Sequence, residues 1–514
     1  MGILFSIPLF LIALFLLRFI YKVIWKPFRI QSAMRRQGIN GPSYKLIHGS
    51  TKEAMFLKQQ ASKGPMELSS HDIFPRVHPN FYAWMKIYGR NFLTWNGPRP
   101  HMVISEPELA KEILSNKESM YPKIKIDGFA VKLVGDGLVM TEGEKWSKLR
   151  KIANHAFYAE SLKEMFPVMV ASVETMIGNW KKYEGKEVEV HHEFDLLTSE
   201  VIARTGFGSS YLEGQHIFAM LTRLGFLLFK NVDKVRVPDI IKGYKTKDDI
   251  ESDEVEQSLR DSIVEILRKR EDKVSKGDAQ NFGNDFLGSL LAAHHAADKK
   301  NRISIDNIID ECKGFFLAGH ETTGSLLTWI FLFLGIHTDW QEKARNEVFQ
   351  VFGQENPKSE GLARLKIVSM IINETLRLYS PVTSLARRAK SDVRLGKYEL
   401  PANMEISIPI IEFHRSQEIW GEDAHLFKPE RFAEGVAKAT RNNPMAFLPF
   451  GFGPRTCVGL NFASNEAKIA LSMILQRFKF TLSPSYVHSP IILVTVRPQH
   501  GLPIILQPLD SMNA

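Results

Sequence analysis

Ten residues near the end of the chain limit, more than any others, what this sequence can fold into and bind. They read Phe450-Gly-Phe-Gly-Pro-Arg-Thr-Cys-Val-Gly459, and Cys457 among them is one of only two cysteines in 514 residues. A pattern typical of a long helix begins directly after them. A thiol at a helix start is placed to become a thiolate, because unpaired N–H groups and the positive end of the helix dipole lie there. The glycines at 453 and 459 permit backbone angles, or a close approach to a flat ligand, that a side chain would block.

A lone thiolate in such a loop suits the axial ligation of haem iron, where its electron density favours cleavage of the O–O bond. Arg455 adds a cation two residues before the sulfur. The pattern F-x-x-G-x-R-x-C-x-G resembles that of the cytochrome P450 family. The resemblance implies that Cys457 ligates the iron and that Phe450, Arg455 and Gly459 bind the haem. The alternative, from the residues alone, is a structural cysteine buried beside a glycine turn.

The same resemblance implies a cytochrome P450 fold, mainly α with minor β sheets. A hydrophobic content of 44% is ample for a large core, and no linker-like or repetitive tract divides the chain after residue 50. We therefore expect residues 46–514 to form one haem-thiolate monooxygenase domain. Two cysteines so far apart exclude a disulfide framework and fit a reducing compartment. The second, Cys312, lies in an apolar helical pattern and is expected to be an inert core residue.

The net charge of +9 does not indicate a nucleic-acid-binding protein, because of where it lies. Residues 1–36 contain no acid and hold six of the basic residues, leaving only +3 for the remaining chain. The six are Arg18, Lys22, Lys26, Arg29, Arg35 and Arg36. The rest of the protein is close to neutral, so no nucleic-acid partner is expected.

An uncharged stretch from Gly2 to Leu17 precedes all six of these cations and predicts a transmembrane signal-anchor over residues 1–21. The alternative is a cleaved signal peptide, which would carry its charges before the apolar run and a small-residue cleavage site after it. The basic cluster predicts a single-pass protein of the endoplasmic reticulum membrane with its catalytic domain in the cytosol. Residues 22–45 are expected to form a basic linker and hinge, which includes Gly38-Ile-Asn-Gly-Pro42.

The longest helical pattern runs from Ser304 to about His337, with Ser304 as its N-cap. Its centre reads Ala318-Gly-His-Glu-Thr-Thr323, and polar residues in a buried helix need partners or a function. This turn resembles the oxygen-activating motif of the family. The resemblance implies that Gly319 gives room to haem and O₂, that Thr322 hydrogen-bonds bound oxygen, and that Glu321 belongs to a proton route. The alternative is a water-filled kink without a catalytic part.

Two further segments are candidates for binding the haem propionates. Trp146 and Arg150 are four residues apart and share one face of a predicted helix, and the family places such a pair at a propionate. Without the resemblance, a surface cation over an aromatic ring explains the spacing equally well. Arg387 lies five residues before Asp392 and matches a second propionate contact, with Arg388 as the adjacent alternative. The resemblance also implies that Val382 to Leu385 face the substrate.

An acid and a base at Glu374 and Arg377 share one helix turn, and the resemblance implies a buried charge triad of these two with Arg431. Residues 160–275 are predicted to form successive helices that cover the substrate cavity. Phe226 to Phe229 line either that cavity or the core. Ile240 and Ile241 are candidates for contact with the membrane.

The resemblance covers essentially the whole chain and is strongest to plant microsomal members. It implies a haem-thiolate monooxygenase that inserts one oxygen atom of O₂ into an apolar small molecule, such as a terpenoid, a hormone or a lipid. The electrons would come from NADPH through a separate flavoprotein reductase, because no flavin or NADPH region is evident in this chain. Lys148 and Lys151 are expected to lie on the helix face opposite Trp146 and to meet this reductase.

Two other functions remain open from the sequence. One is a haem-thiolate hydroperoxide isomerase or dehydratase that needs neither O₂ nor a reductase. The other is a non-catalytic haem-binding sensor or carrier. Retention of Glu321, Thr322 and the complete cysteine loop favours the monooxygenase.

Overall fold

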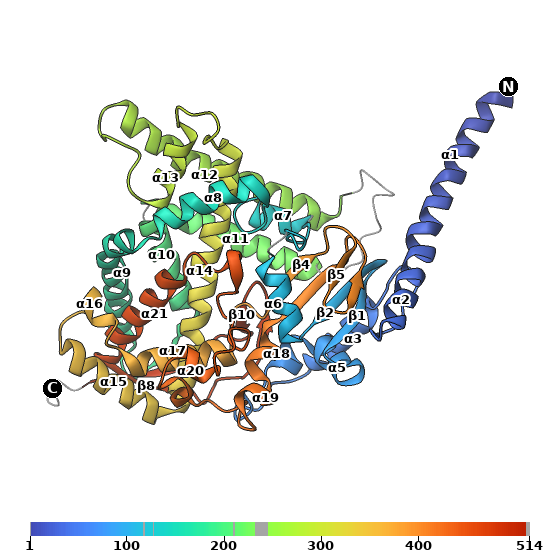
Figure 1. The fold of residues 1–514 in the computed structure, drawn as a ribbon. Helices are drawn as coiled ribbons and strands as arrows, with labels where there is room; N and C mark the ends of the chain where they lie inside the picture. The colour runs from blue at the N-terminus through green and yellow to red at the C-terminus, as the bar shows by residue number, and fades with distance from the viewer. Residues whose placement is uncertain (1, 117–118, 127, 209–210, 232–244, 510–514) are drawn as a thin grey trace.

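The central element of the fold is one long helix, α14 (Ile305–Ile336), which runs through the middle of the molecule (Figure 1). It begins with a capping box, in which the Ser304 hydroxyl accepts from the Asn307 N–H and the Asn307 side chain accepts from the Ser304 N–H. Apolar residues occupy every side of its C-terminal half, and Trp329 and Phe331 are fully buried. A helix that is hydrophobic all round must be covered on all sides, which explains its central place.

This computed structural model describes residues 2–116, 119–126, 128–208, 211–231 and 245–509, and over these residues the fold is mainly helical. Besides α14, the helices are α1 (Gly2–Ile20), a π-helical turn (Tyr21–Trp25), α2 (Lys26–Arg36), α3 (Thr51–Ala61), α4 (Phe74–Val77), α5 (Pro79–Tyr88), α6 (Pro107–Ser115), α7 (Phe129–Val134), α8 (Gly143–Ala156), α9 (Ala159–Trp180), α10 (Val190–Phe207), α11 (Tyr211–Asn231), α12 (Lys247–Ser275), α13 (Phe286–His294), α15 (Thr338–Phe352), α16 (Ser359–Leu362), α17 (Lys366–Leu378), α18 (Ile410–Arg415), α19 (Gln417–Trp420), α20 (Val436–Ala439) and α21 (Leu460–Leu475). The expected class, mainly α with minor sheets, is confirmed.

The strands form small sheets, and the largest of them lies on the side of the molecule near α1 (Figure 1). They are β1 (Asn91–Asn96), β2 (Arg99–Ile104), β3 (Glu187–Glu189), β4 (Ser384–Arg388), β5 (Val393–Leu395), β6 (Tyr398–Leu400), β7 (Glu405–Pro409), β8 (Phe478–Leu482), β9 (Pro490–Ile492), β10 (Val496–Pro498) and β11 (Pro503–Pro508). The largest sheet has the order β1-β2-β7-β4, and a second has the order β3-β11-β8. The pairs β9–β10 and β5–β6 complete the set found in the described residues.

The four-stranded sheet joins two distant parts of the chain. The β1–β2 hairpin closes on the pair Asn96 and Arg99, with Gly97 in the turn at a positive φ of 58°. Strand β7 then pairs with β2 in parallel and with β4 in antiparallel register, in which Arg387 lies opposite Ile406. The register fixes which side chains of β4 point toward the helical body, because side chains alternate along a strand.

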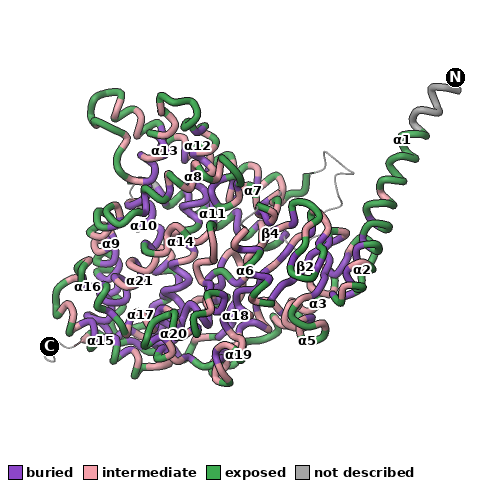
Figure 2. Tube along the Cα trace, viewed as in Figure 1, coloured by how far each residue is buried: buried purple, intermediate pink, exposed green. Residues whose placement is uncertain are grey.

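The N-terminal helix α1 extends away from the body, and most of its described side chains are exposed (Figures 1 and 2). Residues that follow it pack on the sheet. The buried Tyr44 lies with its ring 4.9 Å from that of Trp95, and its hydroxyl donates to the Val23 carbonyl at 2.6 Å. Over the part of the chain that the structure describes, no helix combines the length and apolar character needed to cross a bilayer, so the expected transmembrane helix is not shown.

The described residues between 160 and 275 contain the successive helices α9 to α12, as predicted, together with the short strand β3. Leu227 is fully buried in the core, whereas Phe226 and Phe229 are each 45% exposed on the surface. The residues that line the cavity described below include none of Phe226 to Phe229. Ile240 and Ile241 lie outside the described residues.

The charge triad is present and buried. Arg377 donates from Nε and Nη2 to the two oxygens of Glu374 at 2.8 and 2.7 Å, and neither side chain is exposed. The remaining Arg377 nitrogen donates to the His414 and Ala424 carbonyls at 2.8 and 2.7 Å. Arg431 Nε lies 3.6 Å from Glu374 Oε1. The ion pair therefore ties α17 to the loops that precede the cysteine segment.

Candidate functional site

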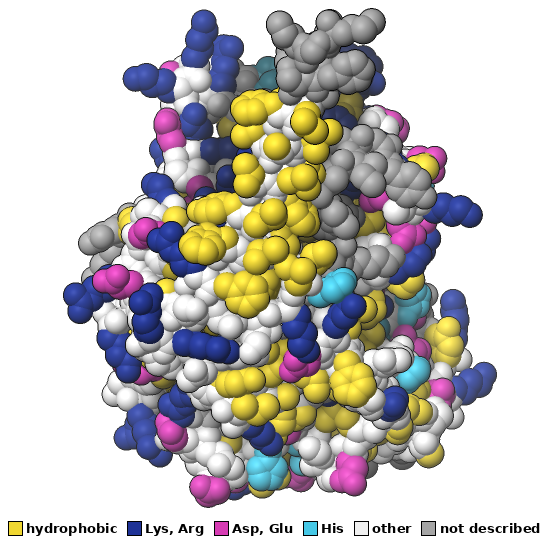
Figure 3. All heavy atoms as spheres, turned by 90° about the vertical axis from the view of Figure 1, so that its right-hand side faces the viewer, with side chains coloured by type: hydrophobic (Ala, Val, Ile, Leu, Met, Phe, Trp, Pro, Cys, Tyr) yellow, Lys and Arg dark blue, Asp and Glu magenta, His cyan; other side chains and the backbone are white. Residues whose placement is uncertain are grey.

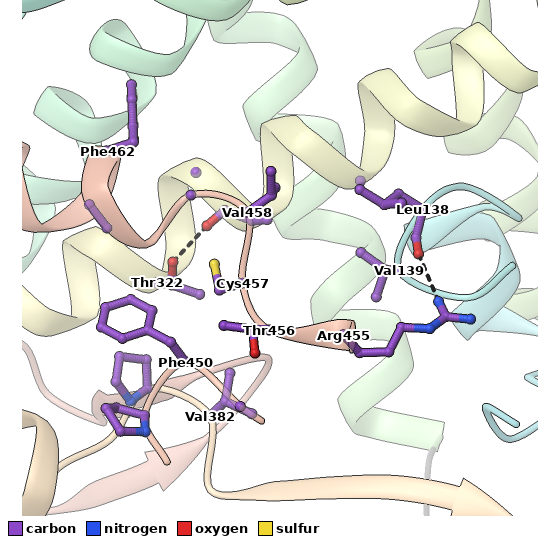
Figure 4. A pocket seen from close by; sticks show the side chains of 18 of the residues that line it. Leu138, Val139, Thr322, Val382, Phe450, Arg455, Thr456, Cys457, Val458 and Phe462 are labelled. Carbon is purple, nitrogen blue, oxygen red and sulfur yellow. Dashed lines mark hydrogen bonds between the residues drawn. The ribbon is translucent and has the colours of Figure 1, made fainter. Parts of the chain in front are cut away.

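A cavity of about 350 Å³ lies between α14 and the loop that carries Cys457 (Figure 4). Its lining is predominantly apolar and comes from α8, α14, β4 and the residues on either side of Cys457. Eight of the nine predicted site residues line it, and the exception is Glu321 on α14. The eight are Trp146, Arg150, Thr322, Arg387, Phe450, Arg455, Cys457 and Gly459.

The cysteine loop is shaped by contacts with its own backbone and with α6. The Cys457 N–H donates to the Phe450 carbonyl at 2.9 Å. Gly453 has a φ of 76°, and a Cβ there would lie 2.5 Å from the Leu114 carbonyl oxygen, so only glycine fits. Gly459, directly before α21, leaves the space beside the Cys457 sulfur free of a side chain. The two glycines therefore have different roles: Gly453 makes the turn and Gly459 gives access to the sulfur.

The Cys457 sulfur is exposed to the cavity, yet the surrounding protein separates it from bulk water. This burial raises the pKa of the thiol, and the Gly459 N–H and the Arg150 cation only partly oppose the shift. In the protein without a bound metal, desolvation therefore outweighs the groups that favour the thiolate. A metal cation at the sulfur would reverse this balance, since it stabilises the thiolate directly.

Arg455 does not act on the sulfur, although it is close in sequence. Its guanidinium donates to the Leu138 and Thr141 carbonyls at 3.2 and 2.7 Å and pairs with Glu142 at 2.7 Å. It also lies over the Trp146 ring, 4.5 Å from the ring centre. Arg455 is thus held at the cavity edge by the segment before α8. Arg150, and not Arg455, is the cation that lowers the pKa of the Cys457 thiol.

A second group of cations lines the same side of the cavity. Arg150 donates to the Thr456 carbonyl at 2.7 Å. Arg387 is 3% exposed and lines the cavity, whereas Arg388 is not among the lining residues. Lys123 also lines the cavity, and the sequence reasoning missed it, because no motif surrounds it. The sequence offers only one indication of its role, which is that Lys123 is a basic residue on the N-terminal side of the predicted helix that carries Trp146.

These buried cations repel one another and lack sufficient negative charge. Burial, together with Arg387 and Arg455, lowers the pKa of Lys123 to about 7. Burial and Arg455 likewise lower the pKa of Arg387 to about 10, while Glu142 opposes both shifts. A bound dianion would remove this repulsion. The two carboxylates of haem, beside an open thiol and a flat apolar cavity, fit the residues that are present.

The opposite wall of the cavity is the polar turn of α14. Thr322 faces the cavity, and its hydroxyl donates to the Ala318 carbonyl at 2.7 Å (Figure 4). Glu321 is buried behind this wall and does not line the cavity; it accepts from the Thr495 hydroxyl at 3.2 Å. The pKa of the nearby Asp195 carboxyl is raised to about 8 by burial and by Glu321. Any part of Glu321 in proton supply is therefore indirect.

Gly319 lines the cavity, where it was expected, and its missing side chain also serves a packing contact. A Cβ at this position would lie 2.7 Å from Cγ1 of Ile202 on α10, so the missing side chain allows α14 and α10 to pack closely. Within the segment 382–385, only Val382 and Leu385 line the cavity. Thr383 is bonded instead to the His78 ring at 2.7 Å, and the Ser384 hydroxyl donates to the Ile408 carbonyl at 3.3 Å. Two of the four residues expected to face the substrate therefore line the cavity.

Comparisons with known proteins agree with this geometry. A family model described as cytochrome P450 matches residues 69–501. The chain is 54% identical over 505 residues to cytochrome P450 CYP749A22 of Panax ginseng, covering 98% of this chain and 96% of that protein. It is 43% identical over 500 residues to 11-oxo-beta-amyrin 30-oxidase of Glycyrrhiza uralensis, with 95% and 94% covered. Among solved structures, retinoic acid bound cyanobacterial CYP120A1 is similar in fold, with a TM-score of 0.75, 24% identity, and 92% and 99% covered.

Proposed function

Because the chain belongs to the cytochrome P450 family of haem-thiolate monooxygenases, we propose that it inserts one oxygen atom of O₂ into an apolar terpenoid, hormone or lipid-like molecule. Electrons come from NADPH through a separate flavoprotein reductase. The observation that carries this proposal is the open sulfur of Cys457, which faces the Thr322 wall across an apolar cavity edged by four cations. A hydroperoxide isomerase would not need the hydroxyl of Thr322, and a haem carrier would need neither Thr322 nor Glu321.

The residues divide into those that hold the haem and those that act on the substrate side. Cys457 would hold the iron, and Lys123, Arg150, Arg387 and Arg455 would hold the carboxylates. Trp146, Phe450 and Gly459 complete the haem site. The haem, when bound, supplies the iron chemistry that activates O₂ and delivers one of its atoms to a C–H bond. The protein does not supply this chemistry itself; it binds, orients and excludes water.

Thr322 carries a proton at Oγ1, and in the structure that proton is donated to the Ala318 carbonyl. A rotation about its side-chain bond would direct the same proton into the cavity, where it can stabilise negative charge on oxygen. We place Glu321 behind Thr322 as part of the route that replaces this proton. Its hydrogen bond with Thr495 and its proximity to Asp195 support such a route.

An apolar substrate is supported by the residues that line most of the cavity. They are predominantly aliphatic or aromatic: Leu138, Val139, Phe315, Leu326, Val382 and Leu385. A large hydrocarbon skeleton gains affinity from such a wall through burial of its surface. The Glycyrrhiza relative is named as an oxidase of 11-oxo-beta-amyrin, and a terpenoid is the substrate class that we favour for this chain.

The decisive experiment uses the full-length protein with haem. A reduced carbon-monoxide difference spectrum should show the long-wavelength band of a thiolate-ligated haem. NADPH oxidation should then require added reductase, and a panel of terpenoids should include one that yields a hydroxylated product. Turnover of a fatty-acid hydroperoxide without reductase would favour the isomerase instead, and a haem spectrum without any turnover would favour the carrier.

Attachment to the endoplasmic reticulum membrane through residues 1–21 is also proposed, with residues 22–45 as linker and hinge and residues 46–514 as the cytosolic domain. Support comes from the column of exposed hydrophobic side chains along α1 (Figure 3), in which Leu9 is 70% and Leu17 is 64% exposed. Such side chains would bury their surface in lipid. The cations that follow them favour the cytosolic side.

Deletion of residues 1–21 is expected to release most of the protein from microsomes, because the exposed apolar surface of α1 is removed. The haem spectrum should persist, since these residues do not contact the cavity. Sedimentation of microsomes, followed by a carbon-monoxide difference spectrum of both fractions, measures the two effects. Tight membrane binding of the truncated protein would show that another surface carries the attachment.

The surface offered to the reductase is proposed to lie on α8. Trp146 and Arg150 lie on the face of this helix that lines the cavity. Lys151 is exposed to solvent and Lys148 is partly exposed. Exposed cations on the cysteine side of the molecule would steer an acidic partner during encounter.

Thr322→Ala is expected to retain haem and to consume NADPH, but to yield roughly 100-fold less product per NADPH, as expected when a donor to developing negative charge is lost. Hydrogen peroxide should be released in place of product. The assay measures NADPH consumption, peroxide and product together. Thr322→Ser keeps the hydroxyl and serves as the matched control. Normal coupling in the alanine variant would show that Thr322 is structural only.

A further inference from the structure

Glu311 on α14 lies outside every motif discussed above and is buried, with an exposure of 1%. Its Oε1 accepts a hydrogen bond from the Leu138 N–H at 2.5 Å. Burial raises the pKa of Glu311 to about 7, while the Leu138 N–H lowers it. A carboxyl group can accept this bond in either protonation state. Glu311 is therefore a buried acid that accepts a hydrogen bond from a backbone N–H far away in the sequence, and such a group needs a physical explanation.

The loop before α8 lies directly on α14 at this point. A Cβ on Gly137 would lie 2.8 Å from Glu311 Oε1, and a Cβ on Gly135 would lie 2.3 Å from Oδ1 of the neighbouring Asp310. The Met140 and Thr141 N–H groups both donate to the Gly137 carbonyl, at 3.0 and 2.9 Å, which makes a tight turn. The loop therefore needs glycines to reach the acids, and its position depends on them.

The peptide groups of Leu138 connect this acid with the haem side of the cavity. The Leu138 N–H is held by Glu311, and its carbonyl accepts from Arg455 Nη1 at 3.2 Å (Figure 4). The side chains of Leu138 and Val139 line the cavity. One residue thus supplies a part of the substrate wall and a support for a haem-side cation.

We propose that Glu311 is a positioning residue that sets both the substrate wall at residues 138–139 and the place of Arg455, through its hydrogen bond to the Leu138 backbone. This inference rests on the proposed function, because it assumes a haem and a substrate in the cavity. Glu311 touches neither of them. It fixes the loop that does, so its loss should alter how well a bulky ligand fits beside the iron.

The test uses imidazole and 4-phenylimidazole as probes of the full-length haem protein. Both can ligate haem iron through a ring nitrogen, but only 4-phenylimidazole carries a bulky apolar group that would sample the wall at residues 138–139. In Glu311→Leu, which cannot accept the Leu138 N–H, we expect the affinity for 4-phenylimidazole relative to imidazole to fall about tenfold, the effect of one lost buried hydrogen bond. Glu311→Gln retains an amide oxygen as acceptor and should behave like the unaltered protein. Asp310→Asn removes the adjacent charge without touching Leu138 and should also leave the ratio unchanged.

A second measurement tests the hydrogen bond between the Leu138 carbonyl and Arg455. Arg455 loses a fixed acceptor when the Leu138 carbonyl moves, so Glu311→Leu should transfer haem to apomyoglobin faster than Glu311→Gln does. Should the leucine variant not fold, Gly137→Ala displaces the same loop from its other side and should lower the same affinity ratio. An unchanged ratio in a folded variant, or an equal change in Glu311→Gln, would refute the positioning role. Absence of any spectral response to imidazole in the unaltered protein would instead refute the proposed function.

Discussion

Cys457→Ser is expected to eliminate the long-wavelength carbon-monoxide band and all monooxygenase activity. A neutral hydroxyl is a poor ligand for haem iron, and the described lining of the cavity places no second thiol near the sulfur position. The loop itself should survive, because its shape depends on the backbone bond from residue 457 to the Phe450 carbonyl and on Gly453. The difference spectrum and the haem content of the purified protein measure this effect.

The other cysteine offers a matched control. Cys312 is buried in α14, where burial raises its pKa well above the ordinary value, and it does not line the cavity. Cys312→Ala should therefore keep the thiolate spectrum, with only the modest loss of stability that follows a small core truncation. A Cys457→Ser protein that retained the long-wavelength band would remove Cys457 from the iron site.

Arg377→Ala is expected to give the largest loss of stability of any substitution considered, on the order of 3–5 kcal/mol, because it leaves the buried Glu374 carboxylate without its main partner. The substitution also strands the His414 and Ala424 carbonyls that Arg377 serves. Arg377→Lys should be intermediate, since a single ammonium cannot make the two parallel bonds to Glu374. The yield of folded haem protein and the midpoint of thermal unfolding by circular dichroism measure the change.

An exposed ion pair on α15 provides the comparison. Lys343 lies 3.2 Å from Asp339, and their side chains are 52% and 62% exposed. Lys343→Ala should change stability by less than about 1 kcal/mol, because surface pairs are screened by water. If Arg377→Ala lowered the midpoint of thermal unfolding by no more than Lys343→Ala does, the buried triad would not stabilise the fold as we argue.

Local chemistry explains why parts of the site could be predicted from the chain. The cysteine loop, the polar turn of α14 and the pair Trp146 and Arg150 are each defined by residues within a few positions of one another. Their spacing along one helix or turn predicts that they share a face, whatever the rest of the fold. The capping box at Ser304 is local in the same sense, and the helix begins where it predicts.

Other residues gained or lost a role only through contacts between distant segments. Lys123 has no motif around it, and it becomes a site residue because its segment lies beside Arg387 and Arg455. Arg455 has a sequence position next to the sulfur, but the acceptors of the segment before α8 turn it away. No spacing along the chain contains this information, since it depends on which loops meet.

By itself the sequence determined the ligand loop, the helical class and the membership in the family, because these follow from residue types at short, fixed separations. Only the tertiary structure decided between Arg387 and Arg388, because the register of β4 against β7 sets which side chains face the cavity. It also placed Glu321 behind the cavity wall and gave Gly319 its packing role against Ile202, because the rotation of α14 is set by the helices around it. The physical reason is the same in each case: side-chain direction depends on how elements far apart in the chain pack together.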